Sequence, residues 1–174
     1  MFRFNRVLPG IALTGLFAVG ALLPAYANPK VGTQAPATIF LSHGRTVSLT
    51  SFHGQKVMLW LFSTWCPSCQ AGLPLLARDE PRFAAEHLHL IILENYRNGG
   101  YPGPALHSLM NRYARMAAHA TNWTVGRATR ATAAAYNSRS YPDIFYLIRP
   151  DGMIERVSSA PAAHLQMILD FARS

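Results

Sequence analysis

Cys66 and Cys69 are the residues of this 174-residue chain whose type and spacing best suit chemistry. They are its only two cysteines, and they flank Pro67 and Ser68. A bridge between them would close a very short loop and would constrain the unfolded chain little, so stability is a poor reason for the pair. Thiol–disulfide exchange, in contrast, needs one accessible thiolate and a second thiol within reach. The pair therefore predicts a redox-active dithiol.

A buried strand and a helix are expected to position this pair. Residues 56–63 form an apolar run without polar alternation, which is typical of a strand covered on both faces. A helix that begins at Cys66 would place that sulfur beside unpaired backbone N–H groups and the positive end of the helix dipole. Pro67 suits the first helical position, and Ser68 brings a hydroxyl near the sulfurs. Trp65 offers a flat apolar flank on which a partner peptide could lie.

The rest of the chain alternates strand and helix patterns. Expected strands are 38–41 and 45–49, paired as a hairpin, then 88–93, 144–148 and 153–157, the last two joined by a tight turn at 149–152. Expected helices are 66–73, 75–86, 105–118, 130–136 and 161–171, with Pro74 kinking or interrupting the first. Residues 122–125 are ambiguous.

Residues 1–27 are predicted to be a secretory signal peptide. Arg3 and Arg6 form a basic start, residues 11–23 are mostly apolar, and Ala25-Tyr26-Ala27 fits a small-x-small cleavage pattern. The alternative is an uncleaved anchor, although the apolar stretch is shorter than the roughly 20 residues of a typical spanning helix. In both cases we expect a domain of residues 28–174 in the periplasm or otherwise outside the cytoplasm, with a membrane tether through the N-terminus left open.

The net charge of +8 comes mostly from scattered arginines. They form neither a dense run nor a stripe interleaved with aromatic residues, so a nucleic-acid partner is disfavoured. A basic solvated surface is the default interpretation, and it could favour acidic partner proteins. The seven histidines show no helical metal-binding pair. We expect neither a metal nor a cofactor.

Several motifs together resemble the redoxin branch of the thioredoxin superfamily, in particular exported, often membrane-tethered disulfide reductases of bacteria. The matching stretches are 44–49, 52–57, 64–69, 136–143 and 149–154. The resemblance implies a three-layer α/β thioredoxin-like fold, with a central mixed sheet, helices on both faces and an N-terminal β-hairpin extension. It also implies exchange with protein thiols and disulfides through a mixed disulfide at Cys66 that Cys69 resolves.

The same resemblance implies a role for Tyr141 and Pro142. From the residues alone, an X-Pro bond is one that can be cis at modest cost, and an ordinary trans proline before an edge strand is the default. The resemblance implies instead a cis Pro142 that faces the dithiol, with backbone groups of Tyr141-Pro142 binding an extended substrate segment. Tyr141 would then border the disulfide and influence redox poise and substrate choice.

Two positions depart from the family pattern. Thioredoxins carry a buried acid six positions before the first cysteine, where this chain has Trp60, and some tethered reductases carry a Glu six positions after it, where this chain has Gly72. Glu94 and Asp143 are the candidate substitutes as proton acceptor for the second cysteine, although a solvated loop carboxylate is the default interpretation of each.

The direction of electron flow and the partner stay open at this point. The resemblance favours a disulfide reductase fed by a membrane electron donor, while a dithiol oxidase and a Cu(I) carrier using the same two sulfurs are the alternatives. A peroxidase is disfavoured because such relatives usually place a lone reactive cysteine in another context. Residues 96–104 form a long loop that is either a plain surface connection or, through Tyr96 and Tyr101, a partner-binding rim.

Overall fold

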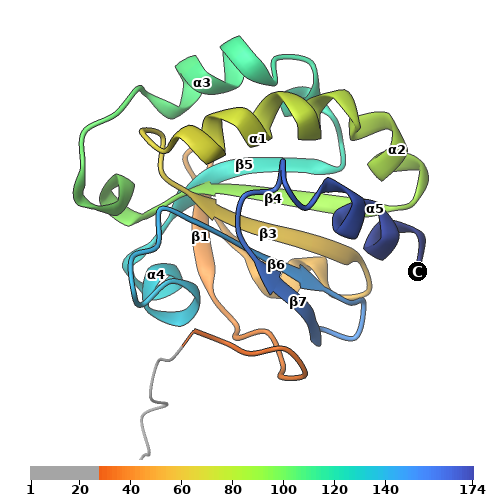
Figure 1. Ribbon diagram of the computed structural model, residues 1–174. Helices are drawn as coiled ribbons and strands as arrows, with labels where there is room; N and C mark the ends of the chain where they lie inside the picture. The colour runs from red at the N-terminus through yellow and green to blue at the C-terminus, as the bar shows by residue number, and fades with distance from the viewer. Residues whose placement is uncertain (1–27) are drawn as a thin grey trace, which may run out of the picture.

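A seven-stranded mixed sheet organises the structure, a computed structural model that describes residues 28–174 (Figure 1). The strand order is β2-β1-β5-β4-β3-β6-β7. The strands are β1 (Ile39–Ser42), β2 (Arg45–Ser48), β3 (Lys56–Phe62), β4 (Leu88–Glu94), β5 (Trp123–Ala128), β6 (Asp143–Ile148) and β7 (Ile154–Ser158). The predicted signal peptide, residues 1–27, lies outside the described residues.

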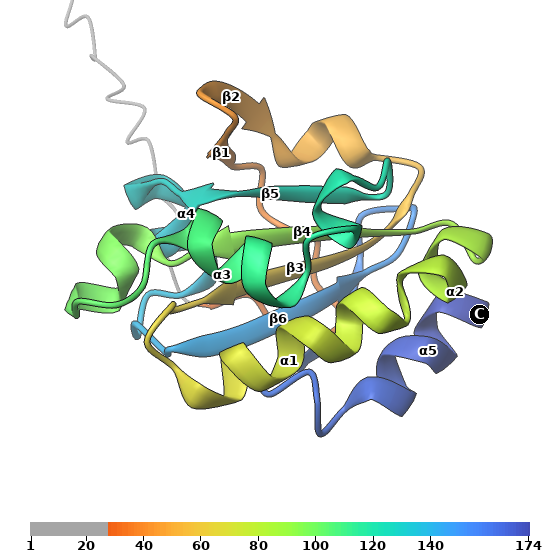
Figure 2. The ribbon, with the colours of Figure 1, turned by 90° about the horizontal axis from the view of Figure 1, so that it is seen from above.

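Helices cover both faces of this sheet. They are α1 (Pro67–Arg78), α2 (Glu80–Ala85), α3 (Leu106–Tyr113), α4 (Arg130–Tyr136) and α5 (Leu165–Arg173), with 3-10 turns η1 (Leu49–Phe52), η2 (Tyr96–Gly100) and η3 (Ala117–His119). Side chains of α1, α2, α3 and α5 share one hydrophobic cluster, and α4 and η1 contribute to a second on the opposite face. Figure 2 shows the larger group of helices from its own side. The predicted three-layer arrangement is confirmed.

The central strand β3 joins the two clusters. It pairs in parallel with β4 and antiparallel with β6. Met58, Trp60 and Phe62 face the α1 layer, while Val57, Leu59 and Leu61 face the α4 layer. Each such apolar side chain contributes about 1.5–3 kcal/mol when it leaves water, which explains the absence of polar alternation in this strand.

The first long helix ends later than the sequence predicts. Pro74 lies inside α1, which continues without a break to Arg78. Proline removes one backbone hydrogen bond there, but its ring is on the exposed face while Leu73 and Leu76 are fully buried and keep the helix packed. The break falls instead at Asp79, whose carboxylate accepts hydrogen bonds from Arg78 and Arg82.

The ambiguous stretch near residue 123 is part of β5, a strand between β1 and β4. Gly126 makes this position possible because a Cβ there would lie 2.2 Å from the carbonyl oxygen of Leu41 on β1. The predicted helices at 105–118 and 161–171 are shorter than expected. α3 stops where Ala114 leaves the helical region with φ −143°, and α5 begins only after a turn that closes with a bond from His164 N–H to Pro161 O.

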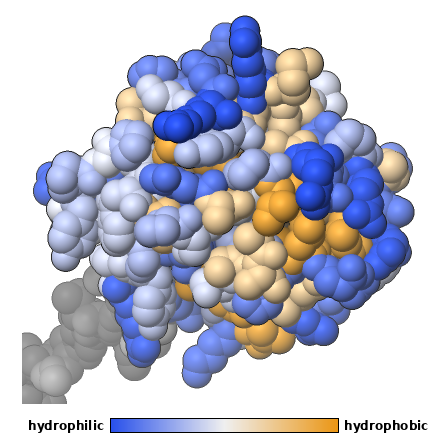
Figure 3. All heavy atoms as spheres, turned by 45° about the horizontal axis from the view of Figure 1, so that its top comes forward, coloured by the Kyte–Doolittle hydropathy of each residue, from blue (hydrophilic) through white to orange (hydrophobic). Residues whose placement is uncertain are grey.

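The predicted hairpin and the tight turn at 149–152 are confirmed. His43 and Gly44 both have positive φ, as a two-residue hairpin turn requires, and Gly152 N–H donates to Arg149 O at 2.8 Å. From the side of α1 and α3, hydrophilic residues cover much of the surface and apolar residues show in patches (Figure 3). Within residues 28–174, no helix is long and apolar enough to cross a membrane.

The topology brings three loops to one edge of the sheet. Because β3, β4 and β5 are parallel, their carboxyl ends share this edge, and β6 runs antiparallel and starts there. The connecting segments 63–66, 95–105 and 129–142, the last of which contains α4, therefore meet beside the start of α1. Such an edge is where α/β folds commonly place their functional residues.

Candidate active site

The two cysteines lie at the start of α1, as the sequence predicts. Cys66 is the N-cap residue and Pro67 occupies the first turn. Both cysteines are thiols, with Cys66 4% and Cys69 0% exposed. The Cys69 thiol donates to the carbonyl oxygen of Pro142 at 3.3 Å. Cys66 is therefore the sulfur that a partner can reach, and Cys69 lies behind it.

Asp143 completes a three-residue cluster with the cysteines. One carboxylate oxygen accepts from Ser68 Oγ at 2.7 Å, and Ser68 Oγ lies 3.1 Å from Cys66 Sγ. Ligand atoms of Cys66, Cys69 and Asp143 all lie within 4.8 Å of one another. Asp143 is only 7% exposed. The default interpretation of this residue as a solvated loop carboxylate is wrong, because it is the first residue of a buried strand.

The surroundings favour the protonated form of the inner sulfur. Burial raises the pKa of the Cys69 thiol strongly, and the negative charge of Asp143 raises it further. Hydrogen bonding to Cys66 acts in the same direction. Cys69 is therefore held as a thiol at neutral pH and needs a proton acceptor before it can act as a nucleophile.

The departures at Trp60 and Gly72 are parts of one arrangement. The indole N–H of Trp60 donates to the second carboxylate oxygen of Asp143 at 2.8 Å. A Cβ on Gly72 would lie 3.2 Å from the edge of the Trp60 ring, so the glycine makes room for the indole beneath α1. The chain thus replaces an acid on β3 with a hydrogen-bond donor that holds an acid on β6.

Glu94, the other candidate acceptor, has a different partner. It lies at the end of β4, as the sequence predicts, and its carboxylate accepts from Arg127 Nε at 2.9 Å. Within residues 28–174 it makes no hydrogen bond to either cysteine, and it lies outside the cluster formed by Cys66, Cys69 and Asp143. The structure therefore brings Asp143 to the dithiol and leaves Glu94 in an ion pair.

Pro142 faces the dithiol, but the expected cis bond is not found. None of the peptide bonds in residues 28–174 is cis. The chain reverses at Ser140, whose φ is 54° and whose N–H donates to Asn137 O. This turn places Pro142, with a trans peptide bond, beside the dithiol. Its carbonyl oxygen accepts hydrogen bonds from the Cys69 thiol and from the Ser63 N–H, the latter at 2.8 Å.

Two buried asparagines hold Tyr141 and Pro142 in place. Asn95 Nδ2 donates to Ser63 Oγ at 3.0 Å and to Tyr141 O at 3.1 Å. Asn137 Nδ2 donates to Asn95 Oδ1 at 2.9 Å and to Tyr141 O at 2.7 Å. Asn137 Oδ1 in turn accepts the Tyr141 N–H. Because these amides are buried and satisfied, they fix the segment beside the sulfurs.

The long loop after β4 is bound directly to the dithiol motif. Asn98 Oδ1 accepts from Thr64 N–H at 2.7 Å, Asn98 Nδ2 donates to Thr64 Oγ1, and Trp65 Nε1 donates to Asn98 O at 2.8 Å. Tyr101 contacts Trp65 edge to face with ring centroids 5.2 Å apart. Gly103 lies so close that a Cβ would be 2.5 Å from Thr64 Oγ1. The loop is a fixed wall of the site.

Asn95 and Asn137 were not among the functional residues predicted from the sequence. One signal was present, since Asn95 follows a buried parallel strand directly and Asn137 follows a helix just before Pro142. Polar residues at such positions share the edge where the functional loops meet. Their pairing with each other joins segments 42 residues apart and has no local pattern.

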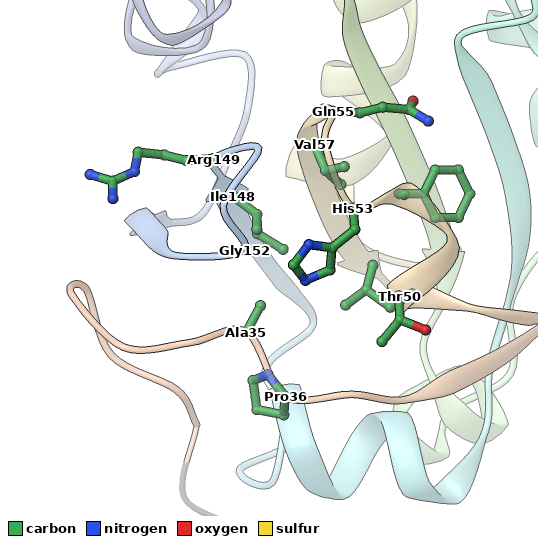
Figure 4. A pocket seen from close by; sticks show the side chains of 11 residues that line it. Ala35, Pro36, Thr50, His53, Gln55, Val57, Ile148, Arg149 and Gly152 are labelled. Carbon is green, nitrogen blue, oxygen red and sulfur yellow. The ribbon is translucent and has the colours of Figure 1, made fainter.

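A separate cavity lies at the opposite end of the sheet. Its lining comes from the N-terminal lead-in, η1, the start of β3 and the β6–β7 turn, and His53 projects between Ala35 and Gly152 (Figure 4). It contains neither cysteine and no carboxylate. The cavity is remote from the dithiol chemistry.

As for metals, Cys66, Cys69 and Asp143 form a group of side chains that could hold an ion.

Comparisons with known proteins agree with this geometry. The family described as AhpC/TSA matches residues 31–98, a stretch that includes both cysteines. A thiol:disulfide interchange protein of the thioredoxin family from Chlorobium tepidum is 19% identical, with a TM-score of 0.62 over 85% of this chain and 100% of that one. The fold is thioredoxin-like. Among curated proteins, none matches the sequence.

Two further solved structures have the same fold. The thioredoxin domain of a thiol-disulfide oxidoreductase from Bacteroides vulgatus is 17% identical, with a TM-score of 0.64 over 83% of this chain and 99% of that one. A secreted disulfide oxidoreductase from Mycobacterium tuberculosis, described as homologous to E. coli DsbE, is 20% identical, with a TM-score of 0.59 over 78% of this chain and 93% of that one. These matches confirm the predicted resemblance to thioredoxin-like redoxins in the fold.

Proposed function

We propose that this protein exchanges thiols and disulfides with exported proteins, and that it acts as a disulfide reductase. The observation that carries the proposal is the buried cluster in which Cys66, Cys69 and the Asp143 carboxylate lie within 4.8 Å of one another at the start of α1. It supplies an outer nucleophile, an inner thiol and an acceptor for the inner proton.

The exchange proceeds in two steps. The Cys66 thiolate attacks a partner disulfide, so that a mixed disulfide forms and one partner thiolate leaves. Asp143 then takes the proton of Cys69, and the Cys69 sulfur attacks Cys66. The Cys66–Cys69 disulfide forms, the second partner sulfur leaves and takes up the proton, and two electrons have passed to the partner.

The environment of the sulfurs supports reduction over oxidation. A dithiol becomes a strong oxidant when its reduced, thiolate form is stabilised. Here burial and the neighbouring Asp143 charge oppose the thiolate at Cys69 by raising its pKa. Cys69 therefore stays a neutral thiol at neutral pH and adds no thiolate that would stabilise the reduced form, which is the feature of a strong oxidant. A reduction potential near the thioredoxin value of about −270 mV supports the proposal, and one near about −120 mV indicates an oxidase.

The cellular setting follows from the predicted N-terminal signal. We propose that residues 1–27 direct export, that residues 28–174 work in the periplasm or another extracytoplasmic space, and that a membrane electron donor reduces the dithiol again. Cleavage of the signal predicts a mature protein that starts near Asn28, whereas an intact Met1 in the membrane fraction indicates an anchor.

A Cu(I) carrier using the same sulfurs is less well supported. Cu(I) selects soft ligands, and the two thiolates suit it. The third group within reach is the Asp143 carboxylate, a ligand type that suits hard ions. The carboxylate is therefore better matched to proton transfer. Purified protein that retains one copper and is silent in disulfide reduction would favour the carrier.

A trapping variant tests the exchange itself. In Cys69→Ser the resolving sulfur is gone, so mixed disulfides to Cys66 should accumulate and identify the substrates. The matched control is Cys66→Ser, which keeps one sulfur but loses the outer nucleophile and should trap nothing. Equal amounts of adduct in the two variants would contradict the assigned roles.

A further inference from the structure

The carboxylates are distributed unequally over the molecule. Six of the eight acidic residues belong to elements at the end of the sheet opposite the dithiol, where β3 and β4 begin and β6 ends. These are Asp79, Glu80 and Glu86 between α1 and β4, Asp151 and Glu155 around the β6–β7 turn, and Asp170 on α5. α5 is placed there by the bond from Lys56 Nζ, at the start of β3, to Ala172 O.

The two acids at the dithiol end are both engaged. Glu94 is paired with Arg127, and Asp143 is buried among Trp60, Ser68 and the cysteines. Three exposed arginines belong to the segments of the same end: Arg97 and Arg139 on loops, and Arg130 as the first residue of α4. Within residues 28–174, none of these three forms an ion pair. The dithiol end therefore has excess positive charge, and the opposite end carries the acids.

Aromatic surface lies beside these arginines. Tyr101 is 64% and Tyr141 is 40% exposed, and Tyr101 leans on the partly buried Trp65 next to Cys66. Arg97 precedes Asn98, the residue that fixes the loop to the dithiol motif, and Arg139 Nη1 donates to Tyr141 Oη at 3.3 Å. The Arg97 guanidinium lies over the Tyr96 ring, 5.3 Å from its centroid, so both cations belong to segments of the dithiol end that hydrogen bonds hold in position.

We propose that this protein selects partners whose reactive cysteine lies in an acidic segment. The partner chain lies over Trp65, Tyr101 and Tyr141, and its Asp or Glu side chains approach Arg97 and Arg139. This inference rests on the proposed disulfide exchange and names its substrate class. Opposite charges at a binding surface act mainly by raising the association rate, and ionic strength weakens the effect.

Two cystine peptides with one core sequence test the preference. One carries Asp and Glu around the disulfide and the other carries Lys, and the second-order rate constant for their reduction is measured at low and high salt. At low salt we expect the acidic peptide to react at least about tenfold faster, and this ratio should shrink as salt is added. Equal rates for the two peptides, or a ratio that salt does not change, would overturn the inference.

Charge-reversal variants locate the effect. Arg97→Asp with Arg139→Glu should remove the acidic preference, and aspartate is chosen at position 97 because φ there is 51°, a conformation that Asp tolerates. The control, Arg115→Glu with Arg156→Glu, changes the net charge equally at exposed sites outside the dithiol loops. If the control variant loses the preference to the same extent, net charge and not this surface is responsible.

A small uncharged disulfide, bis(2-hydroxyethyl) disulfide, separates this inference from the proposed function. If wild-type protein reduces it but treats both peptides alike, the exchange chemistry stands and the acidic preference fails. If wild-type protein reduces neither this compound nor the peptides, the proposed function fails. The rates of the Arg97/Arg139 variant with the two peptides are divided by its rate with this neutral compound, so that a change in the reactivity of Cys66 itself cancels.

Discussion

Replacing the Asp143 carboxylate with an amide is the sharpest test of the proton path. Asp143→Asn keeps the size of the side chain and an oxygen that can accept from the Trp60 indole. Its NH2 group would face Ser68 Oγ, which can turn to accept the hydrogen bond. The variant therefore removes the charge and the base and leaves the packing of β6 against α1 in place.

The structure sets the size of both expected effects. A full charge 4.8 Å from a thiolate sulfur contributes about 3.5 kcal/mol at an effective dielectric constant of 20. Losing it should make the dithiol more oxidising by up to about 75 mV. The loss of a general base should slow resolution of the mixed disulfide by about 10²–10⁴-fold. The variant should thus be slower and less reducing together.

Two measurements follow these effects. Equilibration in glutathione buffers, read by the fluorescence of Trp65 beside Cys66, gives the potential, and stopped-flow release of the second partner thiol gives the resolution rate. In Asp143→Asn that rate should rise steeply with pH, because the raised pKa of Cys69 leaves hydroxide as the acceptor. Glu94→Gln is the matched control and should resemble wild type. A wild-type potential and pH profile in Asp143→Asn would refute the role of Asp143.

Three further predictions concern the frame of the site. Gly72→Glu should lower the unfolding free energy by about 1–3 kcal/mol, because the Trp60 ring occupies the space that the new side chain would need. For the same reason it should not supply a proton acceptor for Cys69. The control Ala71→Glu, at an exposed position, should leave urea unfolding unchanged. Asn95→Ala leaves buried polar groups around Tyr141 unpaired, so it should lower the unfolding free energy by about 2 kcal/mol and slow thiol–disulfide exchange. The exposed Asn111→Ala is its control. An unchanged exchange rate in Asn95→Ala would argue against a positioning role for Asn95. Burial lowers the pKa of His89 to about 4, so the folded protein favours the neutral imidazole. The unfolding free energy should therefore fall as the pH drops from about 6.5 to 4, by about 2 kcal/mol once the partial exposure of His89 is allowed for. His89→Gln should flatten that part of the thermal-unfolding profile, and an unaltered slope would contradict the assignment.

Much of the dithiol's setting could be predicted because it is local. The apolar run before Cys66, the proline after it and the two-residue spacing determine the strand, the turn and the first part of the helix within residues 56–73. The helix of residues 130–136 and the hairpin at His43-Gly44 were predictable for the same reason, since backbone preferences act on neighbours. Pro74 misled because burial of Leu73 and Leu76 outweighs one lost hydrogen bond.

The partners of the dithiol could not be predicted in this way. Ser68 and Asp143 are 75 residues apart, and they meet because β3 pairs antiparallel with β6 and places Phe62 opposite Asp143. From the sequence, Asp143 and Glu94 are equivalent loop acids. The register of β3 with β6 makes Asp143 a buried neighbour of Cys69, and the register of β4 with β5 places Glu94 opposite Arg127.

The sequence by itself therefore determined the kind of chemistry, because the reactive sulfurs, their spacing and the strand before them lie in one continuous segment. The tertiary structure decided which carboxylate lies beside the sulfurs and which charged side chains share their end of the sheet. Those properties depend on side chains from β3, β4 and β6 and the loops between them, which only long-range strand pairing brings to one edge of the sheet. Trp60 shows the difference most clearly. As a sequence position it is a missing acid, and in the fold it is the donor that holds the acid in place.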